Sequence, residues 1–566
     1  TPLVAGTDAE DSIMTYLTKG GLLTLAILLS AWASANERPN IIVMVADDLG
    51  WADVGYHGGP IDTPSLDRLA AEGVQLDRFY TTPICSPTRA ALMTARDPIR
   101  LGVAYATIMP WMNNGIHPDE QFLPQSFLAA GYQTAMVGKW HLGHAQQDFH
   151  PNNRGFEHFY GHLHTEVGYF PPFSNQGGKD FQLNGQSITK DGYETFLLAD
   201  EVSRYIRDRD QDKPFFVYMP FIAPHTPLEA PADLMEKYAD MVDDRKPARA
   251  RNTDNTRRIR QLTMRPSARP AYAAVVDAMD QAIGQVLATL DEQGIADNTI
   301  VLFFSDNGGA AYATGGADNV PLRGGKGETF EGGIRVVSVM RWPAAISSGT
   351  TMEQIMTVMD VFPTLAAAAG IETGITRKMD GQNMWPAIVD NVPSPRQKTL
   401  FFASETPTYG SFSIAAFNEH WKLVQEIEQD NEGTNITNHL FRIADDPYEY
   451  NNLAQEHPEV VQQLAQEIRD WRALYPIAGV RSQLAPPPGW RAPKDWSTWP
   501  RPSETLRDEY ARGMPPGHAR KILDRQLGER GRLIYDCEPS WLAAGFCLNE
   551  EVNLATEKSE KVISDQ

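Results

Sequence analysis

Residues 39–50 read PNIIVMVADDLG, an apolar run over Asn40–Ala46 that ends directly on Asp47 and Asp48. Three more runs of this kind follow along the chain, namely QTAMV at 133–137, FFVYMPF at 215–221 and TIVLFFS at 299–305. Apolarity that is continuous, not alternating, is typical of strands buried on both faces of a parallel sheet. These four runs therefore predict the centre of such a sheet.

Helical patterns lie between the runs, at residues 65–72, 125–130, 195–207 and 271–293. The last has apolar residues at helical spacing from Val275 to Leu290. Strands that alternate with helices predict an α/β sandwich. After about residue 395 the pattern changes to short strands at 399–403, 411–416, 421–425 and 440–443, followed by an amphipathic helix at 458–474. This predicts a smaller C-terminal α+β subdomain with a short antiparallel sheet.

The 566 residues are long enough for several domains, and we divide them into three parts. Residues 1–35 hold an apolar run, Gly21–Ala31, which follows Lys19 and precedes the small residues Ala33-Ser34-Ala35. This predicts a signal peptide cleaved before Asn36, and so a secreted or periplasmic protein; a buried N-terminal helix is the alternative. Residues 36–395 are predicted to form the α/β domain and 396–566 the C-terminal subdomain with an irregular wrap and tail. No other segment has the length and apolarity of a membrane span.

Charge and cysteine content narrow the class of protein. The formal net charge is −22, which argues against a general nucleic-acid binder because phosphate affinity requires excess positive charge. Three cysteines, Cys85, Cys537 and Cys547, are too few for a disulfide scaffold. Cys537 and Cys547 lie close enough in sequence to pair, which leaves Cys85 over.

Polar side chains follow each predicted strand. In an open α/β sheet, ligands bind beyond the carboxyl ends of the strands. A single pair of polar residues after a strand is more often a turn or a helix cap than a binding site. Polar residues after four strands of one sheet predict a binding site. Oxygen donors of this kind suit a hard cation, calcium or magnesium. The residues that follow the four strands are Asp47 and Asp48; Lys139 and His141; His225; and Asp306 and Asn307.

Cys85 lies in the sequence PICSPTR, residues 83–89. Ser86 is predicted as an N-cap and Pro87 as the first helical residue, so Cys85 stands at a helix N-terminus that favours an anion. Arg89 adds a positive charge one turn later. A lone cysteine is commonly a small buried hydrophobe, and a thiolate nucleophile is a poorly matched ligand beside a hard cation.

The segment Cys85–Arg89 resembles the C-x-P-x-R motif of the type I sulfatases, in which a separate enzyme converts the cysteine to Cα-formylglycine. The likeness extends over about residues 39–453. Within the family the sequence resembles most the arylsulfatase B branch, the N-acetylgalactosamine-4-sulfatases. The other segments that carry the likeness are RPNIIVMVADDLGWADVGYH (38–57), VGKWHLG (137–143), SDNGG (305–309) and PLRGGKGETFEGG (321–333).

The resemblance implies an alkaline-phosphatase-like sandwich with a large mixed, mostly parallel sheet. It implies one Ca²⁺, with Mg²⁺ as the alternative, and a hydrated formylglycine at position 85 that attacks sulfur with Asp306 as base. His225 would be the acid for the leaving alcohol, and His141 the base that lets the aldehyde reform. Charge on the sulfate and the hydrate would be stabilised by Arg89, Lys139 and Lys326. The cation ligands implied are Asp47, Asp48, residue 85, Asp306 and Asn307.

The substrate expected is a sulfated saccharide of glycosaminoglycan type, galactosamine-4-sulfate-like, or an aryl sulfate, and the formylglycine-generating enzyme is a transient partner. A basic stretch, Arg245–Arg269, holds nine Lys and Arg residues and would attract a polyanion; a solvated surface loop is its alternative. The competing functions are a phosphate or phosphonate ester hydrolase of the same superfamily and a non-catalytic sulfated-glycan binder. Two-metal phosphatases require more carboxylate and histidine ligands than the sequence offers.

Overall fold

The computed structural model describes residues 1, 38–164, 167–243, 268–311, 316–394, 396, 398–406, 411–430, 433–476, 480, 486 and 490–498. By internal contacts the chain forms two units, residues 1–39 and 40–566, and every element named below belongs to the second. The predicted signal peptide, most of the basic stretch, Cys537 and Cys547 lie outside the described residues.

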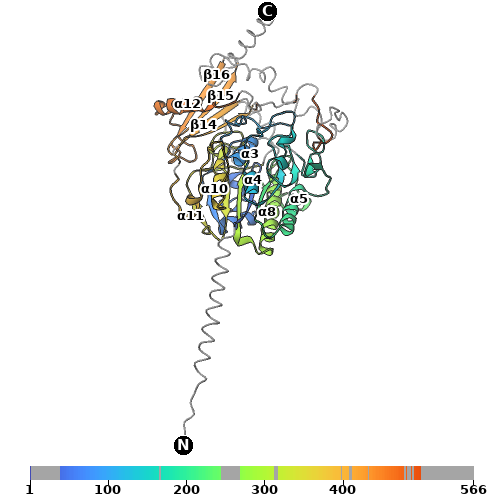
Figure 1. Ribbon diagram of the computed structural model, residues 1–566. Helices are drawn as coiled ribbons and strands as arrows, with labels where there is room; N and C mark the ends of the chain where they lie inside the picture. The colour runs from blue at the N-terminus through green and yellow to red at the C-terminus, as the bar shows by residue number, and fades with distance from the viewer. Residues whose placement is uncertain are drawn as a thin grey trace, which may run out of the picture. The chain divides into compact units, whose positions relative to one another are not determined.

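A ten-stranded mixed sheet forms the centre of the catalytic part (Figure 1). Its four middle strands are parallel neighbours, as predicted, and its edges are antiparallel in part. The strand order is β11 (Thr350–Met352), β2 (Val74–Leu76), β10 (Ser338–Arg341), β9 (Thr299–Ser305), β1 (Asn40–Ala46), β8 (Phe215–Pro220), β4 (Gln133–Lys139), β5 (His158–His162), β6 (Phe181–Leu183) and β7 (Gln186–Ser187).

Both faces of this sheet are covered by helices. Alternate residues of each middle strand point to opposite sides of the sheet, and the apolar residues on each side pack against helices. In β1, Ile41, Val43 and Val45 join one apolar cluster, and the intervening residues join the other. The first cluster is completed by α3 (Cys85–Thr94), α4 (Leu123–Ala129), α10 (Val361–Ala368) and α11 (Trp385–Asp390). The second is completed by α2 (Pro64–Glu72), α5 (Glu194–Asp208), α6 (Ala232–Lys237) and α8 (Ala268–Glu292). Figure 1 shows α10 and α11 on one side of the molecule and α5 and α8 on the other.

Within the described residues, the C-terminal part contains a four-stranded antiparallel sheet against which the helix α12 (Pro458–Arg472) packs. Its strands, in order, are β13 (Leu400–Thr406), β14 (Ser411–Phe417), β15 (Lys422–Asp430) and β16 (Gly433–Phe441). The prediction of a strand at 440–443 was wrong in its bounds: β16 ends at Phe441 and begins at Gly433. Its first half is polar, and backbone pairing with β15 holds it, so the apolar pattern did not reveal it.

The remaining elements are small. A two-stranded sheet joins β3 (Phe79–Tyr80) to β12 (Met356–Thr357), and α9 (Glu331–Ile334) is a single turn. Short 3-10 helices lie at Trp51–Asp53, Gly55–His57, Gln147–Phe149, Pro151–Asn153, Ala296–Asn298 and Val358–Asp360. Among the described helices, none has both the length and the apolarity needed to cross a lipid bilayer.

Candidate active site

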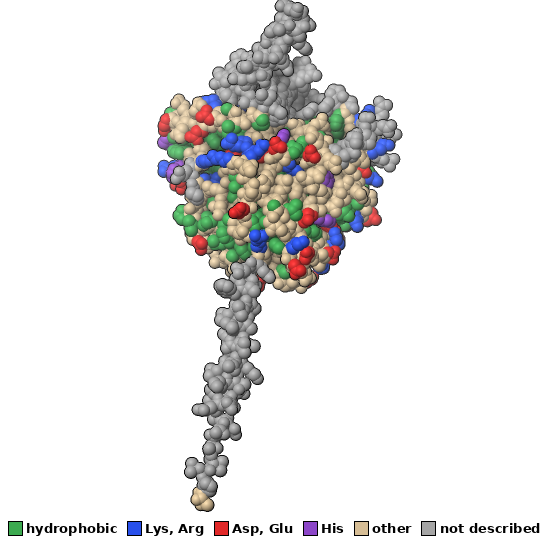
Figure 2. Space-filling model, in the orientation of Figure 1, with side chains coloured by type: hydrophobic (Ala, Val, Ile, Leu, Met, Phe, Trp, Pro, Cys, Tyr) green, Lys and Arg blue, Asp and Glu red, His purple; other side chains and the backbone are tan. Residues whose placement is uncertain are grey.

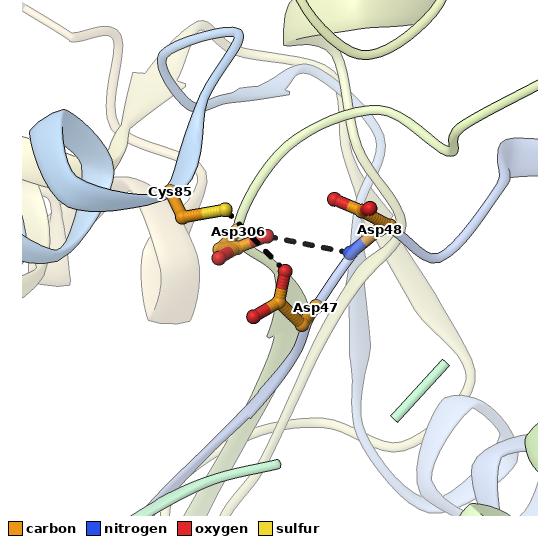
Figure 3. A group of neighbouring side chains, drawn as sticks. All are labelled: Asp47, Asp48, Cys85 and Asp306. Carbon is orange, nitrogen blue, oxygen red and sulfur yellow. Dashed lines mark hydrogen bonds between the residues drawn. The ribbon is translucent and has the colours of Figure 1, made fainter. Parts of the chain in front are cut away.

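The predicted site residues come together at the carboxyl edge of β9, β1, β8 and β4, which are adjacent in the sheet. Asp306 follows β9, Asp47 and Asp48 follow β1, and Lys139 ends β4. Figure 3 shows Asp47, Asp48, Asp306 and Cys85 directed toward one another. All four are buried, and one ligand atom from each lies within 4.8 Å of the others. The convergence follows from the parallel strand directions.

Cys85 enters this cluster from the first turn of α3. Its Sγ lies 3.4 Å from Asp47 Oδ1 and 3.6 Å from Asn307 Oδ1. The prediction that Ser86 caps the helix was wrong, because the helix begins at Cys85 and Ile84 is the residue before it. The Ser86 hydroxyl instead donates to the carbonyl of His141 at 2.9 Å, which ties the start of α3 to the segment after β4.

Three positively charged side chains pair with the three carboxylates. Arg89 Nη2 lies 2.9 Å from Asp306 Oδ2 and 3.0 Å from Asp47 Oδ2, and Nη1 donates to the Lys139 carbonyl at 2.8 Å. The Lys139 ammonium also donates to Asp47. Lys326 Nζ lies 2.7 Å from the Asp48 carboxylate. The charges balance as they stand, so an added divalent cation would leave the site positive and suited to an anion.

Burial and mutual repulsion shift the pKa values of this cluster. Burial alone raises the pKa of Asp47, but nearby positive charges, that of Lys139 above all, outweigh it and hold the pKa well below its ordinary value. Burial and the charge of Asp47 raise the pKa of Asp306 to about 6. Burial and the charge of Asp306 raise the pKa of the Cys85 thiol well above its ordinary value. As an unmodified residue, Cys85 is therefore a protonated thiol at neutral pH and a poor nucleophile.

Two histidines border the cluster. His225 Nε2 lies 3.7 Å from Asp48 Oδ2, and its Nδ1 lies 2.7 Å from the Thr226 carbonyl. A carbonyl oxygen only accepts, so Nδ1 carries a hydrogen and Nε2 is the ring nitrogen that faces the cluster. His141 is buried, and among the described residues neither of its ring nitrogens has a hydrogen-bond partner. Burial and the positive charge of Lys139 hold the pKa of His141 well below its ordinary value, so this ring is neutral.

The donor set fits a hard divalent cation. Asp47, Asp48 and Asp306 supply carboxylate oxygens, and Asn307 adds an amide oxygen. Ca²⁺ and Mg²⁺ prefer oxygen ligands of this kind. The Cys85 thiol is the one soft donor among them, and an oxygen in its place would complete a uniform oxygen set.

Residues that the sequence did not single out fix the segment after β1. The Tyr272 hydroxyl, from α8, accepts a hydrogen bond from Gly50 N at 3.0 Å, and Ser305 Oγ accepts one from Leu49 N at 3.0 Å. Tyr272 lies within a helical apolar pattern, where it is indistinguishable from a core residue. Its hydroxyl comes within 3.5 Å of the Asp48 carbonyl oxygen only in the folded chain.

Arg269 departs from the prediction for the basic stretch. It is buried, and its Nη1 lies 2.5 Å from Asp53 Oδ1 and 2.9 Å from the Gly316 carbonyl. A side chain that is buried and paired in this way cannot contribute to a surface for a polyanion. On the face drawn in Figure 2, basic and acidic side chains are mixed, and one band of Lys and Arg lies across the upper part of that face.

The fold and site define an alkaline-phosphatase-like hydrolase whose buried site suits an anionic ester. The sulfatase family matches residues 39–371, and the family of the N-sulphoglucosamine sulphohydrolase C-terminal region matches 326–473. The chain belongs to the sulfatase family and is a sulfuric ester hydrolase.

Individual relatives agree with this assignment. The chain is 32% identical to arylsulfatase J of Mus musculus, with 77% of this chain and 76% of the relative covered. It is 34% identical to the N-acetylgalactosamine-6-sulfatase of Homo sapiens, with 63% and 67% covered. The solved structure of Ps i-CgsB in complex with k-i-k-neocarrahexaose has a TM-score of 0.67 and 30% identity, and covers 78% of this chain and 94% of that one.

Proposed function

We propose that this protein is an exported sulfatase that removes sulfate from a sulfated saccharide, galactosamine-4-sulfate-like, through a formylglycine formed from Cys85. One observation carries the proposal: the Cys85 side chain is buried among three carboxylates, Asp47, Asp48 and Asp306. Near them, the ring nitrogens of His141 have no hydrogen-bond partner in the part of the chain that the structure describes. A thiol is a poor nucleophile in these surroundings. A hydroxyl at this position would be an oxygen among oxygen donors.

A single Ca²⁺ would be held by Asp47, Asp48, Asp306, Asn307 and the modified residue 85, with Mg²⁺ as the alternative. When bound, the cation withdraws charge from the sulfate oxygens and lowers the pKa of a neighbouring hydroxyl. Arg89 bridges Asp47 and Asp306 and so fixes the two carboxylates relative to each other. With a pKa raised to about 6, Asp306 is the carboxylate best suited to accept the proton of the attacking hydroxyl.

The lysines and histidines take the other roles. Lys139 and Lys326 lie on the carboxylates of Asp47 and Asp48 and supply positive charge where a sulfate would bind. His225 Nε2 lies 3.7 Å from Asp48 Oδ2, at the border of the cluster, and takes the role of acid for the leaving alcohol. The neutral His141 ring is able to accept a proton, as the release of sulfate requires.

Two aromatic side chains near the site support a saccharide substrate. Ile108 N donates to Ser86 Oγ at 3.2 Å, so its loop lies against the residue next to Cys85. On this loop Trp111 meets Trp490 edge to face, with ring centroids 5.9 Å apart, and both rings are partly exposed. Exposed aromatic faces are common where binding sites hold the apolar face of a ligand.

Names of relatives also support the saccharide. One relative is an N-acetylgalactosamine-6-sulfatase, and one solved structure holds a neocarrahexaose. The 4-position of the sulfate, cleavage of a signal peptide before Asn36, and a transient encounter with a formylglycine-generating enzyme belong to the same proposal. The eight basic residues of the stretch outside the described part, from Arg245 to Arg265, remain a proposed contact for an acidic polymer.

The test combines peptide mass with sulfate release. The protein is co-expressed with a formylglycine-generating enzyme, and the tryptic peptide 79–89, FYTTPICSPTR, is weighed. We expect the mass of an aldehyde in place of the CH2SH side chain. The modified protein is then assayed on galactosamine 4-sulfate, galactosamine 6-sulfate, an aryl sulfate and the matched phosphate esters, with Cys85→Ala as the inactive control.

Each outcome decides one part of the proposal. An unmodified thiol after co-expression contradicts the formylglycine route. Faster hydrolysis of phosphate than of sulfate esters favours the phosphate or phosphonate hydrolase alternative. Binding of sulfated saccharides without release of sulfate favours the non-catalytic binder. Preference for the 6-sulfate replaces the proposed position but retains the enzyme class.

A further inference from the structure

Lys326 lies in a segment that cannot hold its own shape. Residues 324–333 contain five glycines, and Gly324 and Gly327 have φ of 82° and 78°. Glycine has the greatest backbone freedom of all residues, so neighbouring structure must impose this conformation. On the catalytic side the backbone is held by Lys326 N on the Gly309 carbonyl at 3.2 Å and by Gly327 N on the Pro83 carbonyl at 2.8 Å.

The other end of the segment is held by a buried ion network. Glu331 Oε1 lies 2.8 Å from Lys422 Nζ on β15, and the same ammonium lies 2.8 Å from Glu449 Oε1. Glu449 Oε2 accepts the hydrogen bond of Glu331 N at 2.9 Å, and the Tyr80 hydroxyl donates to Glu331 Oε2 at 3.0 Å. All three charged side chains are fully shielded from solvent.

Two further contacts join the same segment to the C-terminal sheet. Thr329 Oγ1 and Ser413 Oγ on β14 lie 2.6 Å apart, and both are buried. The ring of Phe330 is fully buried in one apolar cluster with Phe417 and Phe441 of that sheet. Three consecutive residues, 329–331, therefore each contact the C-terminal part by a different kind of interaction.

A buried ion network of this kind is a poor source of stability. Desolvation of the charges offsets their attraction, and well-packed apolar replacements are commonly as stable or more so. Glu449 also has a left-handed backbone, φ 58°, which is unfavourable for a non-glycine residue. Burial, together with the charge of Glu331, raises the pKa of Glu449 to about 7, although the Lys422 ammonium acts to lower it. The unfavourable burial and backbone conformation in this network are explained if the network holds the segment of Lys326 in one geometry.

We infer that Lys422 and Glu449 are positioning residues, which hold the segment 325–333 so that the Lys326 ammonium meets Asp48. The inference rests on the proposed role of Lys326 at the sulfate. The C-terminal sheet is then part of the active-site support, although none of its described residues lies among the carboxylates around Cys85.

The test is a double-mutant cycle on the full chain, modified at Cys85. Lys422→Met is expected to lower kcat/KM by about 10- to 100-fold, the effect of a displacement of about 1 Å. In a Lys326→Ala background the same change is expected to cost less than about twofold, because the residue that it positions is gone. If Lys422→Met does not fold, Lys422→Met combined with Glu449→Gln takes its place: it removes one of the two buried carboxylate charges and leaves Glu331 with Arg335, whose Nη1 lies 3.9 Å from Glu331 Oε2.

Trp471→Phe is the matched control. It removes the hydrogen bond from Trp471 Nε1 to Asp97 Oδ2, 2.7 Å, which joins α12 to the catalytic part away from the Lys326 segment. We expect it to lower Tm but to leave kcat/KM within about twofold. An equal loss of kcat/KM in this control, or an equal effect of Lys422→Met with and without Lys326, overturns the inference.

Hydrogen exchange supplies a readout that needs no catalysis. Amides of residues 325–333 are expected to exchange at least about tenfold faster in Lys422→Met than in wild type and in Trp471→Phe. Unchanged exchange overturns the inference whether or not the protein is active. An inactive wild type with aldehyde at position 85 contradicts the proposed function instead, so the two failures are distinguishable.

Discussion

Asp48 and His141 both have left-handed backbone conformations, with φ of 73° and 61°. Each such residue costs about 1–3 kcal/mol and persists only where surrounding contacts enforce it. Two hydrogen bonds hold the backbone of His141. Its N–H donates to the Leu163 carbonyl at 3.1 Å, and its carbonyl accepts from Ser86 Oγ at 2.9 Å. The strained backbone at Asp48 and His141 is therefore part of the geometry of the site.

A residue-scale prediction concerns His225. If its Nε2 protonates the leaving alcohol, His225→Ala lowers kcat/KM on a sugar sulfate by about 10²–10⁴-fold. The loss is much smaller on an aryl sulfate whose leaving phenol needs no proton. Steady-state kinetics on the two substrates measures the difference. His158→Ala, which alters a histidine paired with Glu201 at the start of β5, is the control and leaves both rates within about twofold.

At the scale of elements, the joint between α12 and the catalytic part contains a partly buried acid, Asp97. Its carboxylate accepts hydrogen bonds from Trp471 Nε1 and Ile99 N. Burial nevertheless raises the pKa of Asp97 from 3.8 to about 6. The folded protein therefore holds this proton more tightly than the unfolded chain does, and the contribution to stability is lost as the pH rises from about 4 to about 6.

The prediction for Asp97 follows from that sign. The unfolding free energy of wild type loses up to about 3 kcal/mol from this group between pH 4 and pH 6, and nothing further above it. Asp97→Asn removes this slope, and denaturant titrations at several pH values compare the two proteins. The same dependence of the unfolding free energy on pH in wild type and Asp97→Asn would contradict the raised pKa of Asp97. Asp445→Asn, at an exposed carboxylate, is the control and leaves the slope unchanged.

Elements with an apolar pattern were predicted with nearly the bounds found. The strands at 40–46 and 299–305 agree, and the helix predicted at 271–293 is α8, Ala268–Glu292. Buried strands and amphipathic helices are recognisable in the sequence from the spacing of their apolar residues. The polar half of β16 has no such spacing, and its strand conformation depends on pairing with β15.

At the scale of the whole molecule, the catalytic part and the C-terminal sheet share a core. Tyr80, Phe330 and Ile334 are fully buried in the same cluster as Phe402 and other residues of that sheet. Exposing those three side chains would cost roughly 5–9 kcal/mol, which is comparable to the whole stability of a domain. The proposed boundary at residues 395 and 396 therefore separates two parts that depend on each other.

A fragment of residues 36–395 is expected not to fold alone, and residues 36–498 are the matched longer chain. Near-UV circular dichroism and cooperative thermal unfolding compare the two after expression under the same conditions. A cooperative transition in the shorter fragment would show that the boundary separates independent domains.

The apolar runs alone predicted the parallel sheet, its four strand ends and the residues that follow them, because the spacing of apolar residues is a local property. Together with the Cys85–Arg89 motif, these predicted the family. Three contacts became apparent only in the folded chain: Ser86 bonds to His141, Arg269 is buried on Asp53, and Lys422 pairs with Glu331 in the segment of Lys326. Such contacts join residues 55 to more than 200 positions apart, and no local pattern encodes which polar groups will meet once burial forces each of them to find a partner.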